Sequence, residues 1–87
     1  MPTVIATQNV KDTAHWLSSP KREEVLGPIG VTNFRTFVNP RNRSSVGVIM
    51  DVPDMDAVMA LMESDEGNAA MEHDGVLAET VEIFIEE

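Results

Sequence analysis

The sequence predicts an α+β domain whose elements follow the order β-α-β-β-α-β. Val31–Asn39 and Ser45–Val52 alternate in polarity and are rich in β-branched residues, which is typical of strands. Met55–Met62 places apolar residues at i, i+3, i+4 and i+7, which is typical of a helix. Because each half of the chain repeats a strand, a helical stretch and a strand, we expect a ferredoxin-like fold over residues 1–87. Its four-stranded antiparallel sheet would carry the helices on one face.

The first half begins with an extended segment, Val4–Val10. Asp12 is suited to cap the helix Thr13–Ser18, because its carboxylate can accept from the free amides of the first turn. Ser19–Pro20 then restarts the helix, with serine as the cap and proline at the first helical position. Gly27–Pro28 ends this helical stretch.

The second half repeats this plan. Residues 40–44 form the turn between the strands Val31–Asn39 and Ser45–Val52, and Met55–Met62 is the next helix. Ser64 caps a further helical stretch, which Gly75 ends. Thr80–Ile85 is the last strand.

A shift of 45 residues superimposes the two halves at Ser19 and Ser64, and at Gly30 and Gly75. We apply this offset to the strands to predict which side chains share a face. The face toward the helices would carry Ile5, Thr7, Phe34, Thr36, Val38, Val46, Val48, Met50, Val52, Val81, Ile83 and Ile85. The opposite face would carry Val4, Ala6, Gln8, Val10, Val31, Asn33, Arg35, Phe37, Gly47, Ile49, Asp51, Glu82 and Phe84.

The face away from the helices is too apolar to remain in water as one patch. A chain of 87 residues buries only about 60–65% of its unfolded surface, and with no cysteine it has no disulfide to compensate. We therefore expect a homodimer in which two sheets pack face to face as an α+β barrel.

The hairpin turn pairs residues whose numbers sum to 84, which sets Arg35 opposite Ile49 and diagonal to Asp51. We expect Arg35 to form a structural ion pair with Asp51 or with a carboxylate of the partner copy. The alternative is that Arg35 binds an anionic ligand.

The charge distribution excludes a polyanionic partner. Net charge is −9, and residues 45–87 hold twelve acidic residues and no Lys or Arg. Nucleic-acid binding requires clustered cations, so no nucleic-acid partner is expected. The sequence begins without a signal-peptide pattern and holds no apolar run of membrane-spanning length, so a cytoplasmic protein without membrane contact is expected.

Both histidines are expected at one end of the molecule. His15 and Trp16 begin the first helix, and His73 ends the second, which runs antiparallel to it. A histidine there could act as a general base, so His15 and His73 are candidate catalytic residues. The alternative is that both are solvent-exposed, since a helix C-terminus favours His73 on electrostatic grounds alone.

A ligand site is expected near these histidines, lined by Trp16, Phe34, Asn39, Met55 and Met59. Aromatic and methionine side chains form adaptable apolar walls, although Trp16 and the methionines also suit an ordinary core. No metal is expected, because neither histidine has a carboxylate at i+3 or i+4, and no sequence motif indicates a cofactor.

The chain resembles the dimeric α+β barrel superfamily over nearly its whole length. The resemblance rests on VKDTAHW, GVTNFRTFVNP, DVPDMDAVMALMESDEGNAAMEHDGV and the closing TVEIFIEE. It is most similar to small stand-alone bacterial members related to antibiotic-biosynthesis-type monooxygenases. The resemblance implies a homodimer with ligands between helices and sheet. Members of this type often carry a histidine in the first strand, where this chain has Gln8.

Three functions are compatible with these features. The first is binding of a small apolar or aromatic ligand between helices and sheet by a homodimer. The second is a cofactor-independent monooxygenase, or an isomerase or cyclase, acting on an aromatic or polyketide-like substrate with a histidine as base. The third is haem binding through a histidine.

Overall fold

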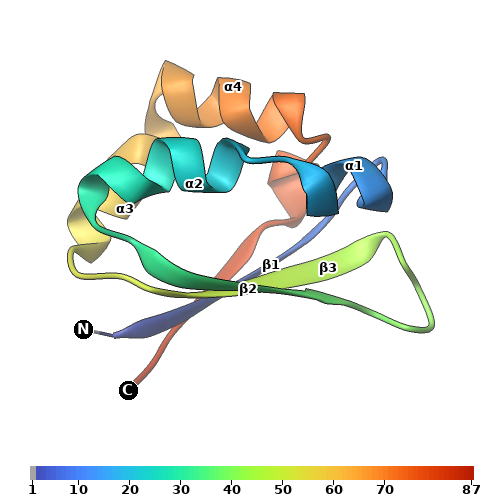
Figure 1. The fold of residues 1–87 in the computed structure, drawn as a ribbon, viewed down its shortest axis with the longest axis horizontal. Coiled ribbons are helices and arrows are strands. Elements are labelled where there is room, and N and C mark those ends of the chain that lie inside the picture. The colour runs from blue at the N-terminus through green and yellow to red at the C-terminus, as the bar shows by residue number, and fades with distance from the viewer. Residues whose placement is uncertain (1) are drawn as a thin grey trace.

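The computed structural model describes residues 2–87 as a two-layer arrangement of helices over a sheet (Figure 1). The strands form one antiparallel sheet in the order β2-β3-β1-β4, as the ferredoxin-like prediction requires. They are β1 (Thr3–Asn9), β2 (Thr32–Val38), β3 (Ser45–Asp51) and β4 (Glu82–Ile85). The helices are α1 (Thr13–Ser18), α2 (Lys21–Leu26), α3 (Met55–Glu63) and α4 (Asp65–His73), with 3-10 turns η1 (Gly27–Ile29) and η2 (Ala78–Thr80).

The predicted helix caps are largely confirmed. Asp12 accepts a hydrogen bond from the His15 amide at 3.1 Å, and the Ser64 hydroxyl accepts one from the Gly67 amide at 3.1 Å. The restart at Ser19 differs by one residue, because α2 begins at Lys21 and Pro20 occupies the cap position. The Ser19 hydroxyl still accepts from the Lys21 amide, so it satisfies one of the free donors.

Helix α4 folds back closely on the end of α3, and Gly67 permits this. A Cβ placed on Gly67 would lie 2.0 Å from the Leu61 carbonyl oxygen, so any side chain here would force the backbone to shift. The two helices therefore turn tightly at Ser64 and cover the sheet together, on the same side as α1 and α2 (Figure 1).

The face prediction is confirmed for β3 and wrong for β1. Val46, Val48 and Met50 are buried under the helices, as expected. In β1, however, Val4 and Gln8 are the buried residues, and Ile5 is 40% exposed on the opposite face. Ala6 and Val10, also assigned to the outer face, belong to the core as well.

The reason lies in the length of α3. Asp12 and Asp54 occupy the same cap position in the two halves, and they are 42 residues apart. The offset between the halves is therefore 42 from β1 up to these caps. Helix α3 has nine residues and α1 has six, so the offset becomes 45 only after these helices. An even offset keeps a side chain on its face and an odd one reverses it, so 45 placed β1 the wrong way round.

A bulge at the start of β2 corrects a second assignment. The register of β2 with β3 shifts between Thr32 and Arg35, and Asn33 has a φ of 58°. An extra residue reverses the alternation, so Val31 is buried in the core although it was assigned to the outer face. Beyond the bulge, Arg35 pairs with Ile49 as predicted.

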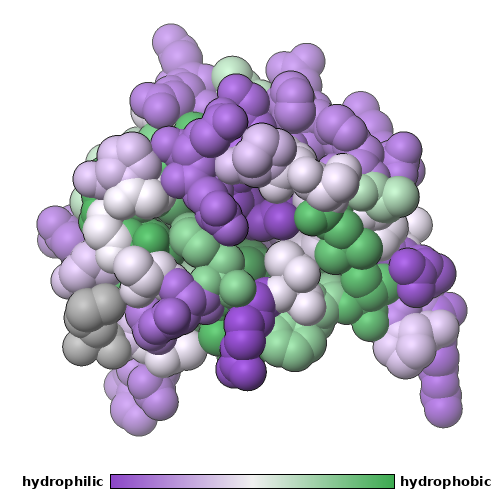
Figure 2. Space-filling model, viewed as in Figure 1, coloured by the Kyte–Doolittle hydropathy of each residue, from purple (hydrophilic) through white to green (hydrophobic). Residues whose placement is uncertain are grey.

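Polar side chains cover the helical layer, and hydrophobic ones lie at the level where the helices meet the sheet (Figure 2). Trp16, Val4 and Val52 are the large side chains most completely enclosed there. None of the helices within residues 2–87 has the length and apolar character needed to cross a membrane.

Candidate functional site

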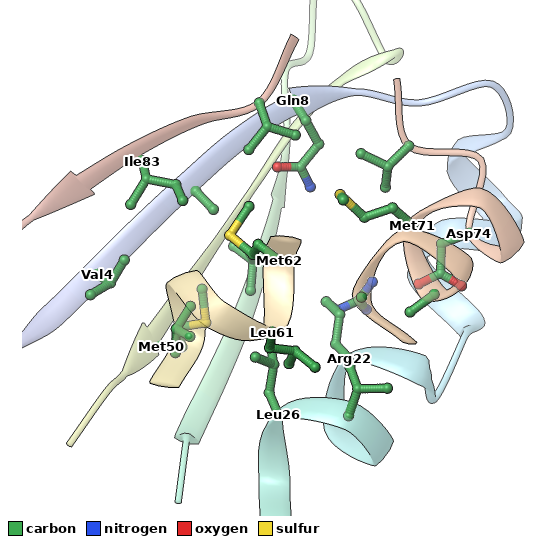
Figure 3. A pocket seen from close by; sticks show the side chains of 18 of the residues that line it. Val4, Gln8, Arg22, Leu26, Met50, Leu61, Met62, Met71, Asp74 and Ile83 are labelled. Atoms are coloured by element: carbon green, nitrogen blue, oxygen red, sulfur yellow. The ribbon is translucent and has the colours of Figure 1, made fainter. Parts of the chain in front are cut away.

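A cavity of about 120 Å³ lies between the inner face of the sheet and the helices. Every strand except β2 contributes to its wall, together with α1, α2, α3 and α4 (Figure 3). The lining is almost entirely apolar, with the methionines Met50, Met55, Met62 and Met71 among its members. Unbranched methionines adapt to irregular shapes, so this wall can fit more than one ligand outline.

The Gln8 side chain reaches into this cavity from β1 (Figure 3). The residue is 8% exposed, and the side-chain hydrogen bonds found within residues 2–87 include none to its amide. No fully buried side-chain nitrogen or oxygen within residues 2–87 lacks a partner, so the Gln8 amide remains accessible from the cavity, where a ligand can bond to it. The amide offers both a donor and an acceptor.

Arg22 and Asp74 line the cavity on the helical side, opposite Gln8 (Figure 3). The Arg22 guanidinium lies 4.4 Å from the centroid of the Trp16 ring and donates to the Trp16 carbonyl at 3.0 Å. Burial lowers the pKa of Arg22 from its ordinary value, and the nearby Asp74 carboxylate opposes that change. The two charges therefore compensate each other within the wall.

Asp74 is also the centre of a hydrogen-bonded chain that leads to the surface. Its buried carboxylate accepts from the Ser19 hydroxyl and lies 3.0 Å from His73 Nδ1. His15 Nε2 lies 2.8 Å from the His73 carbonyl oxygen, and the two imidazole centroids are 5.3 Å apart. Since a carbonyl only accepts, His15 carries its proton on Nε2.

The predicted convergence of His15 and His73 at one end is therefore found. Both rings are exposed, however, and neither belongs to the cavity wall that the structure describes. Within residues 2–87, Asp74 is the ionisable cavity residue whose side chain also contacts a histidine side chain. A base in direct contact with a cavity ligand would have to be Asp74, with His73 behind it.

Of the predicted ligand-site residues, Trp16 and Met55 line the cavity. Phe34 packs against the core beside a separate hollow. The Asn39 side chain accepts from the Arg41 amide in the hairpin turn, and Met59 is exposed on α3. These three do not contact the cavity, so the site is deeper and further from the turn than expected.

Sequence reasoning missed Gln8 and Arg22 as cavity residues. Gln8 was placed on the outer face by the 45-residue offset, although the matching caps Asp12 and Asp54 carried the correct spacing. Arg22 gave no local signal, because its guanidinium reaches the cavity by folding over Trp16 from the next helix.

The outer face holds the second polar pair of the prediction. Asp51 accepts from Asn33 Nδ2 at 2.6 Å and from Thr3 Oγ1 at 3.0 Å, and these two bonds lower the pKa of its carboxyl. Within residues 2–87, Arg35 forms no ion pair with Asp51 and lies 6.0 Å from the centroid of the Phe37 ring. The intrachain ion pair expected of Arg35 is therefore not formed.

Solved structures share this fold across the whole chain. An antibiotic biosynthesis monooxygenase gives a TM-score of 0.61 at 15% identity, covering 100% of this chain and 97% of its own. A Nitrosomonas europaea protein provisionally assigned as an antibiotic biosynthesis monooxygenase gives 0.65 at 15% identity, over 100% and 97%. A conserved Methanosarcina mazei Go1 protein gives 0.64 at 18% identity, over 97% and 88%.

The similarity to antibiotic-biosynthesis-type monooxygenases that the sequence indicates is thus confirmed for the fold. Identities of 15–18% establish the architecture, and the activity has to be argued from this chain's own residues. No family model matches the chain, and no curated protein matches it in sequence.

Proposed function

We propose that this protein binds a small aromatic ligand, one ring in size with a hydrogen-bonding substituent, in the cavity between helices and sheet. The observation that carries the proposal is the Gln8 amide, which has no hydrogen-bond partner within residues 2–87 and lines an apolar cavity of about 120 Å³. An engineered apolar cavity of about 150 Å³ in another protein binds benzene, so this volume suits a single ring. A pocket with few polar groups in an apolar wall is also the usual form of a ligand site.

The polar groups of the wall favour a neutral hydroxyl substituent. Arg22 and Asp74 already compensate each other, so the wall has no excess charge that a ligand must balance. Gln8 can donate to a phenolic oxygen and accept from its proton at the same time. A phenol would therefore place its ring among the methionines and its hydroxyl at Gln8.

Phenol and toluene test this arrangement, because they differ only by a hydroxyl in place of a methyl group. We expect wild-type protein to bind phenol more tightly, in titrations followed by amide NMR shifts. Gln8→Leu should weaken phenol binding about tenfold, the worth of one hydrogen bond of roughly 1.4 kcal/mol, and leave toluene binding within about twofold.

The matched control is Thr7→Val, a polar-to-apolar change on the same strand but on the outer face. It should alter neither affinity. Equal losses of phenol and toluene binding in Gln8→Leu would contradict the assigned role of the amide. Shifts confined to residues outside the cavity would contradict the site itself.

A second candidate function is cofactor-independent oxygenation of an aromatic substrate that carries an acidic methylene group. Its support is the fold shared with an antibiotic biosynthesis monooxygenase, together with the contact of Asp74 with both cavity and His73. Asp74 would accept a methylene proton, and the carbanion would reduce dioxygen. One oxygen atom would remain as a carbonyl and the other would leave as water, which balances the reaction.

The cavity volume argues for a single-ring substrate and against a polyketide-like one. Haem is not proposed, because its macrocycle is far larger than one ring and neither histidine lines the cavity. Oxygen uptake with 4-hydroxyphenylacetonitrile, a single-ring phenol with an acidic methylene, tests the oxygenase. Catalytic uptake that is lost in Asp74→Asn would support it, and no uptake by folded wild-type protein would contradict it.

We also propose that two copies pack through the outer faces of their sheets. This face carries the exposed Ile5, Phe37 and Phe84, and the strand register sets Phe84, Ile5 and Ile49 in one row. A contiguous apolar row of this kind is typical of an interface. Arg35 stands at the end of the row, opposite Ile49, where a carboxylate of the second copy would pair with it.

Sedimentation equilibrium tests the dimer. We expect twice the chain mass at micromolar concentration for wild-type protein and the chain mass for Ile5→Glu, because the new carboxylate would be buried at the interface without a partner. Glu79→Gln, an exposed change on the η2 turn, is the control and should leave the mass unchanged. A wild-type mass of one chain would contradict the proposal.

A further inference from the structure

Two histidines and one carboxylate gather at the end of α4. His15 on α1, His73 at the last turn of α4 and Asp74 directly after it each offer one ligand atom, and these atoms lie within 4.8 Å of one another. The histidines are 58 residues apart in sequence, so only the fold brings them together. The cluster lies outside the cavity, except that the Asp74 carboxylate also lines the cavity wall.

The surrounding contacts hold these side chains in place. The Ser19 hydroxyl donates to Asp74 Oδ1, the same oxygen that lies 3.0 Å from His73 Nδ1, and Asp74 is only 3% exposed, so the carboxylate is held in place. The Asp12 cap fixes the first turn of α1, from which His15 projects. Donors in the shell behind a ligand orient it and raise its affinity for a metal.

We propose that this cluster binds a divalent transition-metal ion such as Zn²⁺ through one ring nitrogen of each histidine and one carboxylate oxygen. Imidazole nitrogen and carboxylate oxygen are common zinc ligands, and three protein ligands leave a position for water or another molecule. The negative end of the α4 dipole adds a favourable field for a cation. The site departs from the sequence prediction, which expected no metal because no carboxylate lies at i+3 or i+4 from either histidine.

The geometry requires one small adjustment. A tetrahedral zinc ion with bonds of about 2.0–2.1 Å holds its ligand atoms roughly 3.3 Å apart. The 3.0 Å separation of His73 Nδ1 and Asp74 Oδ1 is already close to this value. The widest separation of 4.8 Å must shrink by about 1.5 Å. Rotation of the exposed His15 ring provides this movement at the cost of its 2.8 Å contact with the His73 carbonyl oxygen.

The positive charge of Arg22 reduces the attraction that Asp74 exerts on a metal ion. Its guanidinium acts on Asp74 from the cavity side, so part of the carboxylate's charge is already compensated. The metal ion would lie on the other side of the Asp74 carboxylate from Arg22. Because Asp74 lines the cavity, the ion would lie at the cavity rim. The inference rests on the side-chain cluster and stands whether or not the cavity binds an aromatic ligand.

Calorimetric titration of ZnCl₂ into the full chain tests the proposal. We expect one zinc ion per chain for wild-type protein. His15→Ala and His73→Ala should each weaken binding at least tenfold, and both changes lie at exposed side chains, so the variants are expected to fold. Far-UV circular dichroism checks that each variant retains its secondary structure.

The matched control is Glu72→Gln, which removes an exposed negative charge next to His73 without removing a ligand. Its zinc affinity should remain within about twofold of wild type. A second readout is the NMR signal of each imidazole carbon-bound proton, and both should shift to completion at one equivalent of zinc. Wild-type affinity in both histidine variants, or imidazole signals that do not move, would overturn the site and assign any zinc uptake to scattered surface carboxylates.

Discussion

The two faces of the sheet are built from alternate residues of the same strands, yet they differ in what covers them. On the inner face, Val4 and Val48 are buried under the helices, and the packing leaves one ring-sized cavity at Gln8. On the outer face, residues 2–87 leave Phe84 and Ile5 of the row exposed, with Ile49 half-buried beside them. The inner face thus has a local gap that suits a small molecule, and the outer face has an open apolar surface that suits a second copy.

The largest difference between the two faces is expected in the stability lost when an aromatic side chain is removed. Trp16→Ala is expected to lower the free energy of unfolding by about 3–5 kcal/mol, because the side chain is only 1% exposed. Phe84 is 54% exposed, so Phe84→Ala should cost less than about 1 kcal/mol in the dissociated chain.

Urea denaturation at two protein concentrations measures both changes. The Phe84→Ala loss should grow at the higher concentration, because dimerisation adds to wild-type stability by mass action. A large loss that is independent of concentration would mean that Phe84 is part of the monomer core.

The cover of the inner face depends on the tight turn between α3 and α4. Gly67→Ala should cost about 1–3 kcal/mol, since its Cβ would meet the Leu61 carbonyl oxygen. Gly27→Ala is the matched glycine variant, with open space around it and a φ of −53°, and should be neutral or slightly stabilising. Equal thermal midpoints for the two variants would contradict the close approach.

Replacement of a polar residue by an apolar one should change the free energy of unfolding differently on the two faces. Gln8→Leu is expected to raise the free energy of unfolding by up to about 1 kcal/mol in the absence of ligand, because it replaces a polar side chain with an apolar one in an apolar wall. Thr7→Val on the outer face should change it by less than about 0.5 kcal/mol. Chemical denaturation measures both. Destabilisation by Gln8→Leu would indicate that the amide is already satisfied in the free protein.

The smallest effect concerns Asp51 on the outer face. Its bonds with Asn33 and Thr3 lower its pKa, so they stabilise the fold while the carboxyl is ionised. This contribution is present above the unfolded pKa of about 3.9 and is lost as the pH falls through the lower folded value. The stability gap between wild type and Asp51→Asn should therefore narrow from pH 7 to pH 3. A gap that is constant over this range would contradict the assignment.

The sequence was sufficient for the order of the elements, the caps at Asp12 and Ser64, and the hairpin register at Arg35. These depend on local chemistry or on short loops, which a sequence displays directly. The convergence of His15 and His73 also followed, because antiparallel helices place the start of one beside the end of the other.

The cavity was less predictable from the sequence. Its polar groups depend on which face of a strand a residue occupies and on how far a long side chain extends. One miscounted offset moved Gln8 to the wrong face, and one bulge at Asn33 moved Val31 into the core. Arg22 enters the wall only because Trp16 is packed beneath its guanidinium, a contact between two helices that no spacing reveals.

Intermolecular NOE measurements on protein saturated with phenol test the central claim most directly. We expect contacts from the ring protons to the methyl groups of Met62 and Met71, and from the ortho protons to the Gln8 side-chain amide. Contacts only to outer-face residues such as Phe37 and Ile49, or no contacts at saturating phenol, would contradict a ligand site inside the cavity.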